Sequence, residues 1–306
     1  MLLLGPRLAW AQEQQAPIRV EVSRVNVGVT VTDSRGKFVG SLRQSDFQIS
    51  DNNVEQPIVG FLANDDPAQV VLMMECGPPL RLFGMENIVK ADALIARLAP
   101  QDKIAIVCYS TGPALQFALS SNLSAARLAL QNLDFTTGFA ALNLSKSLLE
   151  VLNWLHSIPG KKTVVLISSG IDSSPPEIPS EFQSAIIASE VRVLAVSTSG
   201  PVKKAPKHKN DHGDRQNREE WKNALKEADE TLKNAAGYTG GRAYFPKNAK
   251  DYDRIYAEIA ELVRHEYSLA FVPQTFDGKL HTLSVTSKQG SRVDHRQAYL
   301  APASSN

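Results

Sequence analysis

The chain has 306 residues, of which 43% are hydrophobic and 21% are charged, and its formal net charge is +1. This length and composition are typical of a globular protein with a substantial core, built as one large domain or two modest ones. Because positive and negative charges nearly balance, the composition gives no broad basic field and argues against nucleic-acid binding.

The first residues have the features of a short export signal. Residues 1–4 are apolar, and Ala9-Trp10-Ala11 matches a small-x-small cleavage pattern before Gln12. We therefore predict a signal peptide over residues 1–11, truncated at its start, and export to the periplasm or the exterior. The alternative is an ordinary N-terminus. No later run of about 18 apolar residues occurs, so we expect no membrane span.

Residues 18–62 are predicted to form a β-rich segment. Apolar and polar residues alternate over 18–22 and 25–31, which is the period of a strand with one buried face. Turn residues at 33–37 and 51–53 separate these stretches from two more short strands, at 47–50 and 58–61.

Residues 66–264 are predicted to form an α/β domain, because strands alternate there with amphipathic helices. Nearly continuous apolar runs, as in strands buried on both faces, occur at 70–74, 103–109, 163–167 and 191–196, with a shorter hairpin strand at 114–118. Helices are predicted at 88–98, 142–155, 218–236 and 252–264. This order favours a doubly wound, mostly parallel sheet.

Residues 201–217 interrupt the alternation with a basic insertion that has no apolar period. It is either a contact patch or a solvated loop, and we favour the solvated loop.

The C-terminal segment, 265–302, returns to β structure. Strands are predicted at 267–272 and 281–287, with turns at Asp277-Gly278 and Gln289-Gly290. Because neither β-rich end has enough strands to bury a core alone, we expect this segment to pack against residues 18–62 as one small β module beside the α/β domain.

The two cysteines, Cys76 and Cys108, follow or end predicted core strands. Two cysteines are no disulfide framework, and buried cysteines often act as small hydrophobic residues. If the two strands are neighbours in an exported protein, however, the thiols could form a disulfide. The sequence leaves both interpretations open.

Several phrases resemble a known family. They are the stretch Val29-Thr30-Val31-Thr32-Asp33-Ser34-Arg35-Gly36-Lys37-Phe38-Val39 with Leu42, Asp46-Phe47 and Gln56-Pro57-Ile58, the stretch Ala235-Ala236-Gly237-Tyr238-Thr239-Gly240-Gly241-Arg242-Ala243-Tyr244, and the tyrosines Tyr267 and Tyr299. Together they resemble the exported proteins of Acidobacterial type that are related to von Willebrand factor type A (vWA) domains. The resemblance implies a Rossmann-like α/β fold, while the family itself says little about function.

The resemblance also identifies the loops where a vWA domain holds its metal ion-dependent adhesion site. In the first loop, Glu75 stands at the Asp position of DxSxS, and Gly77 and Pro79 replace its serines. In the second loop Ala140 takes the place of the Thr, or Phe139 does if the register shifts by one. In the third loop Ser168-Ser169-Gly170 replaces TDG, with Asp172 just beyond.

Glu75, Ser168, Ser169 and Asp172 are the oxygen ligands that remain, fewer than Mg or Ca prefers. We therefore expect a degenerate site without a metal or another cofactor. The alternative is a metal-dependent adhesion or ligand-binding domain with a reduced ligand set. No hydrolase, zinc-protease or phosphate-loop motif is present, and the six histidines are scattered, so we expect no enzyme activity.

The expected function is therefore binding of a protein partner, which the sequence does not name, through the loops at the carboxyl ends of the strands. The apolar residues Pro78, Pro79 and Phe139 fall where vWA relatives carry polar ligands, and we assign them to this partner face. Phe139 has a second interpretation, in which it fills the space that a metal would occupy.

Overall fold

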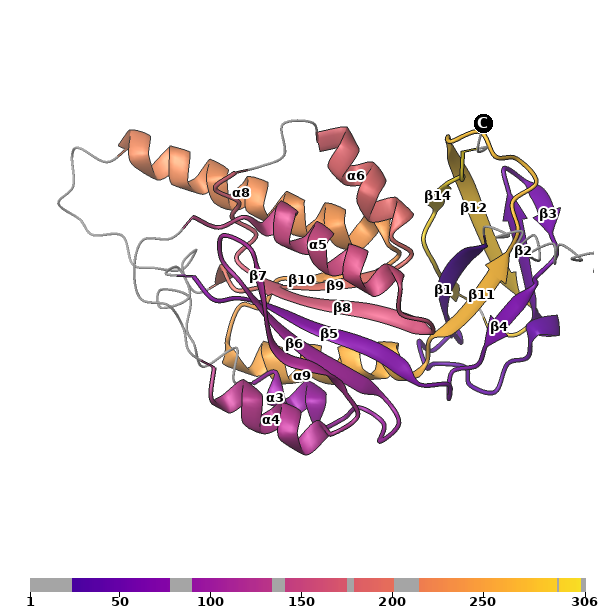
Figure 1. Ribbon diagram of the computed structural model, residues 1–306, viewed down its shortest axis with the longest axis horizontal. Helices are drawn as coiled ribbons and strands as arrows, with labels where there is room; N and C mark the ends of the chain where they lie inside the picture. Colours follow the sequence, from indigo (N-terminus) through magenta and orange to yellow (C-terminus); the bar gives the residue numbers. More distant parts are fainter. Residues whose placement is uncertain are drawn as a thin grey trace, which may run out of the picture.

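Figure 1 shows the computed structural model, which describes residues 24–77, 90–133, 141–174, 179–200, 215–290 and 292–303. An α/β domain with helices on both sides of a sheet lies next to a smaller part made of strands. The smaller part contains the first and the last strands of the chain, as the colours of Figure 1 show.

The α/β domain is built on a six-stranded sheet with the order β10-β9-β8-β5-β6-β7. Neighbouring strands from β10 to β6 are parallel, and β7 pairs antiparallel with β6. The strands are β5 (Ala68–Glu75), β6 (Lys103–Tyr109), β7 (Pro113–Ser120), β8 (Lys161–Ser168), β9 (Arg192–Ser197) and β10 (Ala243–Tyr244). The mostly parallel sheet agrees with the prediction.

Helices cover both faces of this sheet (Figure 1). On one side lie α3 (Asp92–Ile95), α4 (Leu123–Gln131) and α9 (Ala249–Arg264), and on the other α5 (Leu144–His156), α6 (Pro179–Ala188) and α8 (Arg215–Tyr238). The prediction of a doubly wound α/β domain is therefore confirmed.

The central strand β5 shows why the sheet is buried on both faces. Val70, Leu72 and Met74 pack with the helices of one side, whereas Val71 and Met73 pack with those of the other. Side chains that alternate along a strand point to opposite faces, so a strand between two helical layers needs apolar residues at every position. Burial of each side chain of this size stabilises the fold by about 1.5–3 kcal/mol.

The β module consists of two four-stranded sheets, with the orders β13-β1-β11-β4 and β14-β12-β2-β3. A short helix, η1 (Gln44–Asp46), precedes β2. The strands are β1 (Val25–Thr32), β2 (Phe47–Asp51), β3 (Val54–Gln56), β4 (Gly60–Leu62), β11 (Tyr267–Phe271), β12 (Leu280–Ser287), β13 (Arg292–Asp294) and β14 (Ala298–Leu300).

Each sheet of the β module combines N-terminal and C-terminal strands. β1 pairs with β11, where Val27 lies opposite Leu269, and β2 pairs with β12, where Ile49 lies opposite Val285. These four side chains belong to one buried cluster. The two ends of the chain therefore share a core, as the strand count predicted.

The limits of several elements differ from the predictions. α8 extends over Arg215–Tyr238 rather than 218–236, and α9 begins at Ala249 rather than 252 because Asn248 and Asp251 form a capping box there. α3 accounts for only the end of the predicted helix 88–98. The predicted signal, the strand at 18–22 and the part of the basic insertion from 201 to 214 lie outside the described residues.

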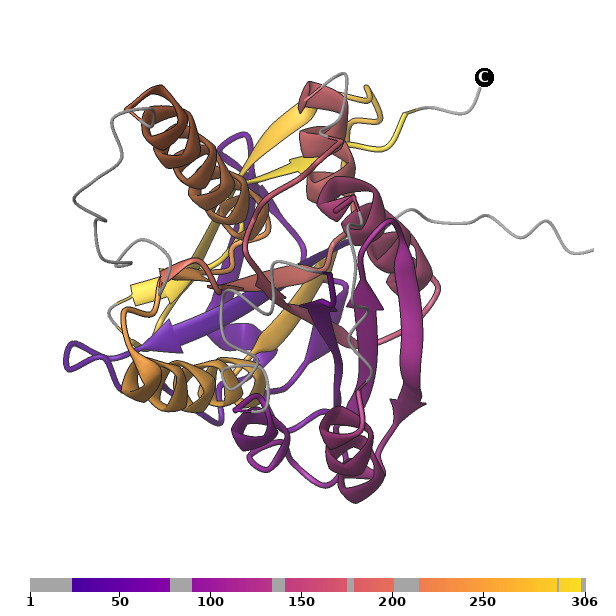
Figure 2. The ribbon, with the colours of Figure 1, turned by 90° about the vertical axis from the view of Figure 1, so that its left-hand side faces the viewer.

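The carboxyl ends of the parallel strands point away from the β module (Figure 1), and Figure 2 looks onto this edge of the α/β domain. The described chain begins and ends within the β module, at the opposite end of the molecule.

Candidate functional site

The candidate site lies where the carboxyl ends of β5 and β8 meet. β5 is central, with β6 on one side and β8 on the other, and this change of direction in strand order is where open α/β sheets bind ligands. Glu75 ends β5, Ser168 ends β8, and Ser169 follows directly. The fold thus brings together three of the residues that the sequence assigned to the site.

The carboxyl group of Glu75 is fully buried and is surrounded by hydrogen-bond donors. Its Oε2 atom accepts from the Ser169 backbone N–H at 2.8 Å and from the Ser169 hydroxyl at 2.7 Å. The hydroxyls of Tyr109 and Ser168 lie 3.3 and 3.4 Å from the same oxygen. Glu75 Oε1 has no hydrogen-bond partner among the described residues.

Burial raises the pKa of the Glu75 carboxyl above its ordinary value of 4.5, and the hydrogen bonds from Ser169, Tyr109 and Ser168 offset only part of this effect. Burial and the nearby Glu75 charge raise the pKa of Tyr109 well above its ordinary value. Removal from water disfavours the charged form of an acid. The surroundings therefore disfavour the ionised form of both side chains.

The two serine hydroxyls are already used within the protein. Ser168 Oγ accepts from the Gly170 N–H at 2.8 Å and lies 2.6 Å from the Tyr109 hydroxyl. Ser169 Oγ accepts from the Ile171 N–H at 3.2 Å while it donates to Glu75. These bonds satisfy the backbone at the end of β8, which is the local role that short hydroxyl side chains often have in turns.

Asp172 faces a helix instead of joining the cluster. Its Oδ2 accepts from the backbone N–H of Ser145 at 2.8 Å, in the first turn of α5, and its Oδ1 accepts from the N–H of Ser174 at 3.0 Å. A carboxylate at the N-terminus of a helix is stabilised by the free N–H groups and by the helix dipole. Asp172 is therefore a helix cap from a neighbouring loop.

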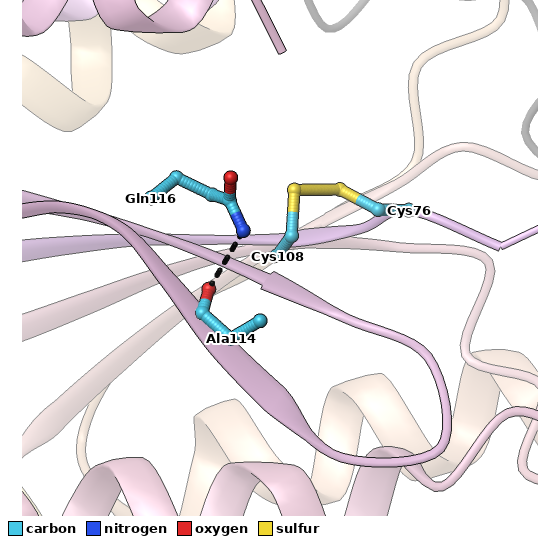
Figure 3. Close-up of a disulfide and its surroundings, with 4 residues drawn as sticks. All are labelled: Cys76, Cys108, Ala114 and Gln116. Atoms are coloured by element: carbon cyan, nitrogen blue, oxygen red, sulfur yellow. Dashed lines mark hydrogen bonds between the residues drawn. A yellow bond between two sulfur atoms is a disulfide. The ribbon is translucent and has the colours of Figure 1, made fainter. Parts of the chain in front are cut away.

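A disulfide joins Cys76 and Cys108, which are the sequence neighbours of Glu75 and Tyr109 (Figure 3). Their Cα atoms are 5.4 Å apart. Cys108 pairs with Met74 in the register of β5 and β6, and Cys76 directly follows β5 in the same buried cluster. The Cys76 N–H also donates to the Tyr109 carbonyl at 2.9 Å. The structure thus decides between the two interpretations of the cysteines, and the bond fixes the start of the first loop.

The other predicted site residues are placed only in part. Gly77 is buried at the end of the described part of the first loop. Pro78, Pro79, Phe139 and Ala140 lie outside the described residues, so their assignment to the degenerate site and to the partner face stays a prediction.

The sequence reasoning missed Tyr109 as a member of the site. Tyr109 lies opposite Glu75 in the pairing of β5 with β6, and its side chain is fully buried. The available signal was a tyrosine at the end of the strand predicted at 103–109. Side chains opposite each other in neighbouring strands lie on the same face of the sheet.

The described residues fit a divalent cation poorly. Of the ligands that were predicted to remain, Glu75 is the one carboxylate in the cluster, the Ser168 and Ser169 hydroxyls make internal hydrogen bonds, and both oxygens of Asp172 are engaged elsewhere. Within the described ranges, no three side chains of His, Cys, Asp or Glu lie together as a metal site. Mg and Ca need about six or more oxygen ligands.

Among the described histidines, His281 has the most extensive polar contacts, and they lie in the β module. Its Nδ1 is 2.8 Å from Asp51 Oδ1, its Nε2 is 3.2 Å from Asp277 Oδ1, and the Tyr299 hydroxyl donates to Asp51 Oδ2 at 2.7 Å. Asp51, His281 and Tyr299 are buried, so this group joins β2, β12 and β14. A polar group that is completely hydrogen-bonded can hold such strands in one register.

Comparisons with known proteins gave similarities to solved structures. No family model matches the chain, and no curated protein matches it. A vWA protein from Catenulispora acidiphila is 12% identical with a TM-score of 0.48, over 84% of this chain and 74% of that one.

Two further similar structures come from other bacteria. BatB from Bacteroides thetaiotaomicron is 13% identical with a TM-score of 0.44, over 65% and 99% of the two chains. The vWF domain of the type V pilus tip protein Mfa5 from Porphyromonas gingivalis is 11% identical with a TM-score of 0.44, over 64% and 95%. The strand order and the helical layers of this chain define its fold.

No helix in the described part of the chain is long and apolar enough to span a membrane.

Proposed function

We propose that this chain is a non-catalytic, exported protein–protein interaction module of the vWA type that has lost its metal site. The observation that carries the proposal is the environment of Glu75. Its carboxyl group is fully buried, and one of its oxygens lies within 3.4 Å of four donor groups of the protein. A carboxyl group used in this way closes the end of the sheet and is a poor ligand for an ion from solution.

Export is supported by the disulfide between Cys76 and Cys108 and by the signal predicted over 1–11. Disulfides persist in oxidising compartments and are rare in the reducing cytosol. We accordingly place the protein in the periplasm or the exterior, where a partner protein would meet it.

The proposed contact face is the carboxyl edge of the sheet. Gly77, Ala141 and Ser173 mark the places where three loops from separate parts of the chain reach this edge, and Ala141 and Ser173 are exposed. The β module holds the described ends of the chain at the opposite end of the molecule, so a contact here leaves those ends free (Figure 1). Loops held by a rigid sheet are a common place for binding residues.

A metal titration tests the loss of the metal site. We expect no saturable rise in melting temperature when Mg, Ca or Mn is added at millimolar concentration, because a ligand that binds only the folded state raises that temperature. Glu75→Gln is the matched variant, since it keeps the shape of the side chain and removes its charge.

The second candidate function, metal-dependent adhesion or ligand binding with a reduced ligand set, is favoured by one observation. Glu75 Oε1 is buried without a hydrogen-bond partner among the described residues and could serve as a ligand. A saturable rise in the wild-type melting temperature that Glu75→Gln abolishes would establish this function and refute the loss of the site.

Site-specific photo-crosslinking tests the contact face. A photoreactive residue at Ala141, which is exposed at the carboxyl edge, should form a discrete crosslinked product in the native cell envelope. The control position is Val54 in the β module, which is 54% exposed. Crosslinking from Val54 with none from Ala141 would place the contact face in the β module and would refute this assignment.

A further inference from the structure

The joint between the α/β domain and the β module contains buried charges from both parts. Arg192, at the start of β9, and Glu266, just before β11, form an ion pair with 3.1 Å between Arg192 Nη1 and Glu266 Oε2. Their side chains are 3% and 4% exposed. Lys161 of β8 donates to the backbone oxygen of Glu266 at 3.3 Å and to that of Asn64 at 3.0 Å, so it holds both connections between the two parts.

A second pair of charges lies beside the first. Glu190 accepts from the Asn26 backbone N–H at 2.9 Å and from its side-chain amide at 2.6 Å. Arg296 donates to the Ile187 oxygen at 2.9 Å and to the Asn26 oxygen at 2.7 Å. Glu190 has a φ of 57°, a conformation that costs energy for a residue with a side chain, so the contacts of its carboxylate hold it there.

These groups line a small, partly open cavity of about 10 Å³. Its polar lining consists of Asn26, Glu190, Arg192, Thr239, Glu266 and Arg296. Gly28 also lines it, and a Cβ atom there would lie 2.6 Å from Glu266 Oε1 and 3.4 Å from Arg192 Nη2. The absence of a side chain at this position is therefore what lets the charged groups approach β1.

Three buried donor atoms of this lining have no hydrogen-bond partner among the described residues. They are Arg192 Nε, Arg192 Nη2 and Arg296 Nε. Nε and Nη2 form one edge of a guanidinium group, whose two N–H bonds can point to a single acceptor. Buried donors are nearly always satisfied in folded proteins, by the protein or by an internal water.

We propose that this joint cavity binds one water molecule, held by Nε and Nη2 of Arg192 and by Nε of Arg296. The volume fits, because a site for one water needs about 10–15 Å³ on this measure. A neutral ligand also fits the charge of the site. The formal charges of the two guanidinium groups and the two carboxylates in the lining sum to zero, so the cavity favours neither a cation nor an anion. One lone pair of the water would accept from the two Arg192 N–H groups, and the other would accept from Arg296 Nε–H. Its protons would then be available to Glu266, whose Oε2 atom has no hydrogen-bond partner among the described residues.

A high-resolution crystal structure of the whole chain tests the proposal without any substitution. We expect one ordered peak within about 2.7–3.2 Å of both Arg192 atoms. A crystal soaked in bromide should give no anomalous peak there. A bromide peak would show an anion site, and donors satisfied by other protein groups would remove the need for a ligand; either result overturns the proposal.

Magnetic relaxation dispersion of water tests the same proposal in solution, because it counts water molecules that stay bound for long times. Arg192→Met should remove one long-lived water. The control is Arg127→Met, since Arg127 is exposed, pairs with Asp92 and is absent from the cavity lining. Equal counts in the wild type and in a folded Arg192→Met variant would overturn the proposal. If that variant does not fold, the wild-type crystal structure decides alone.

Discussion

Removal of the disulfide between Cys76 and Cys108 is the perturbation whose magnitude follows most directly from the structure. The bond joins residues that are 32 positions apart. The loop-closure relation for a crosslink of this span gives roughly 3.7 kcal/mol of stabilisation at 25 °C, through restriction of the unfolded chain. For a chain of 306 residues, such a loss lowers the melting temperature by about 6 °C.

The assay is equilibrium unfolding in urea, with and without a reductant. Reduction of the wild type should lower the unfolding midpoint and raise the dependence of stability on urea, because an unfolded chain without the crosslink exposes more surface. The double variant Cys76→Ala, Cys108→Ala is the control: its midpoint should be low and should not respond to the reductant.

Two results would refute this reasoning. One is a count of two free thiols in the protein purified from an oxidising compartment, since the bond would then not form there. The other is an unchanged wild-type midpoint after complete reduction, since the bond would then contribute nothing to the free energy of unfolding.

Three further substitutions test the buried polar groups. Burial makes the folded state bind the Glu75 proton more tightly than the unfolded chain does. The free energy of unfolding of the wild type should therefore fall as the pH rises above about 4.5. Urea unfolding from pH 4 to 8 measures this dependence, and Glu75→Gln should remove the contribution of Glu75 to it. Tyr299→Phe leaves a carboxylate oxygen of Asp51 without its 2.7 Å hydrogen bond and should cost about 1–3 kcal/mol in the same assay; no loss would contradict the role of this bond. Gly28→Ala should lower the melting temperature, because its Cβ would lie 2.6 Å from the buried carboxylate of Glu266. The control Gly112→Ala, whose Cβ would have no atom within 4 Å, should leave the melting temperature nearly unchanged. Equal effects of the two substitutions would contradict the close approach of Glu266 to Gly28.

The sequence predicted the elements that depend on local patterns. The apolar run at 70–74 gave the central strand, because a strand between two helical layers must be apolar at every position. The alternating residues at 25–31 gave β1, and the small number of strands at each end gave the shared β module. The boundaries of elements were predicted less accurately. Asn248 caps the start of α9 through a capping box, which the apolar pattern does not reveal.

The arrangement of the site depended on contacts that local patterns do not contain. Asp172 looked like a remaining ligand because it follows Ser169 closely, but its oxygens cap α5 and bond to Ser174. The disulfide required β5 and β6 to be neighbours in register, which two separate strand patterns do not fix. The polar groups at the joint come from residues as far apart as Asn26 and Arg296, so no sequence window could have grouped them.

Glu75 and Glu266, two buried glutamates of the described chain, differ in how well their surroundings balance a negative charge on the carboxyl group. Burial raises the pKa of both Glu75 and Glu266, but Arg192 and Lys161 act against this effect only at Glu266. Glu75 has hydrogen-bond donors instead of a cation, so a negative charge there has no opposite charge to balance it. Ionisation of Glu75 should therefore leave an unbalanced negative charge at the carboxyl edge of the sheet, whereas a charged Glu266 at the joint faces Arg192 and Lys161.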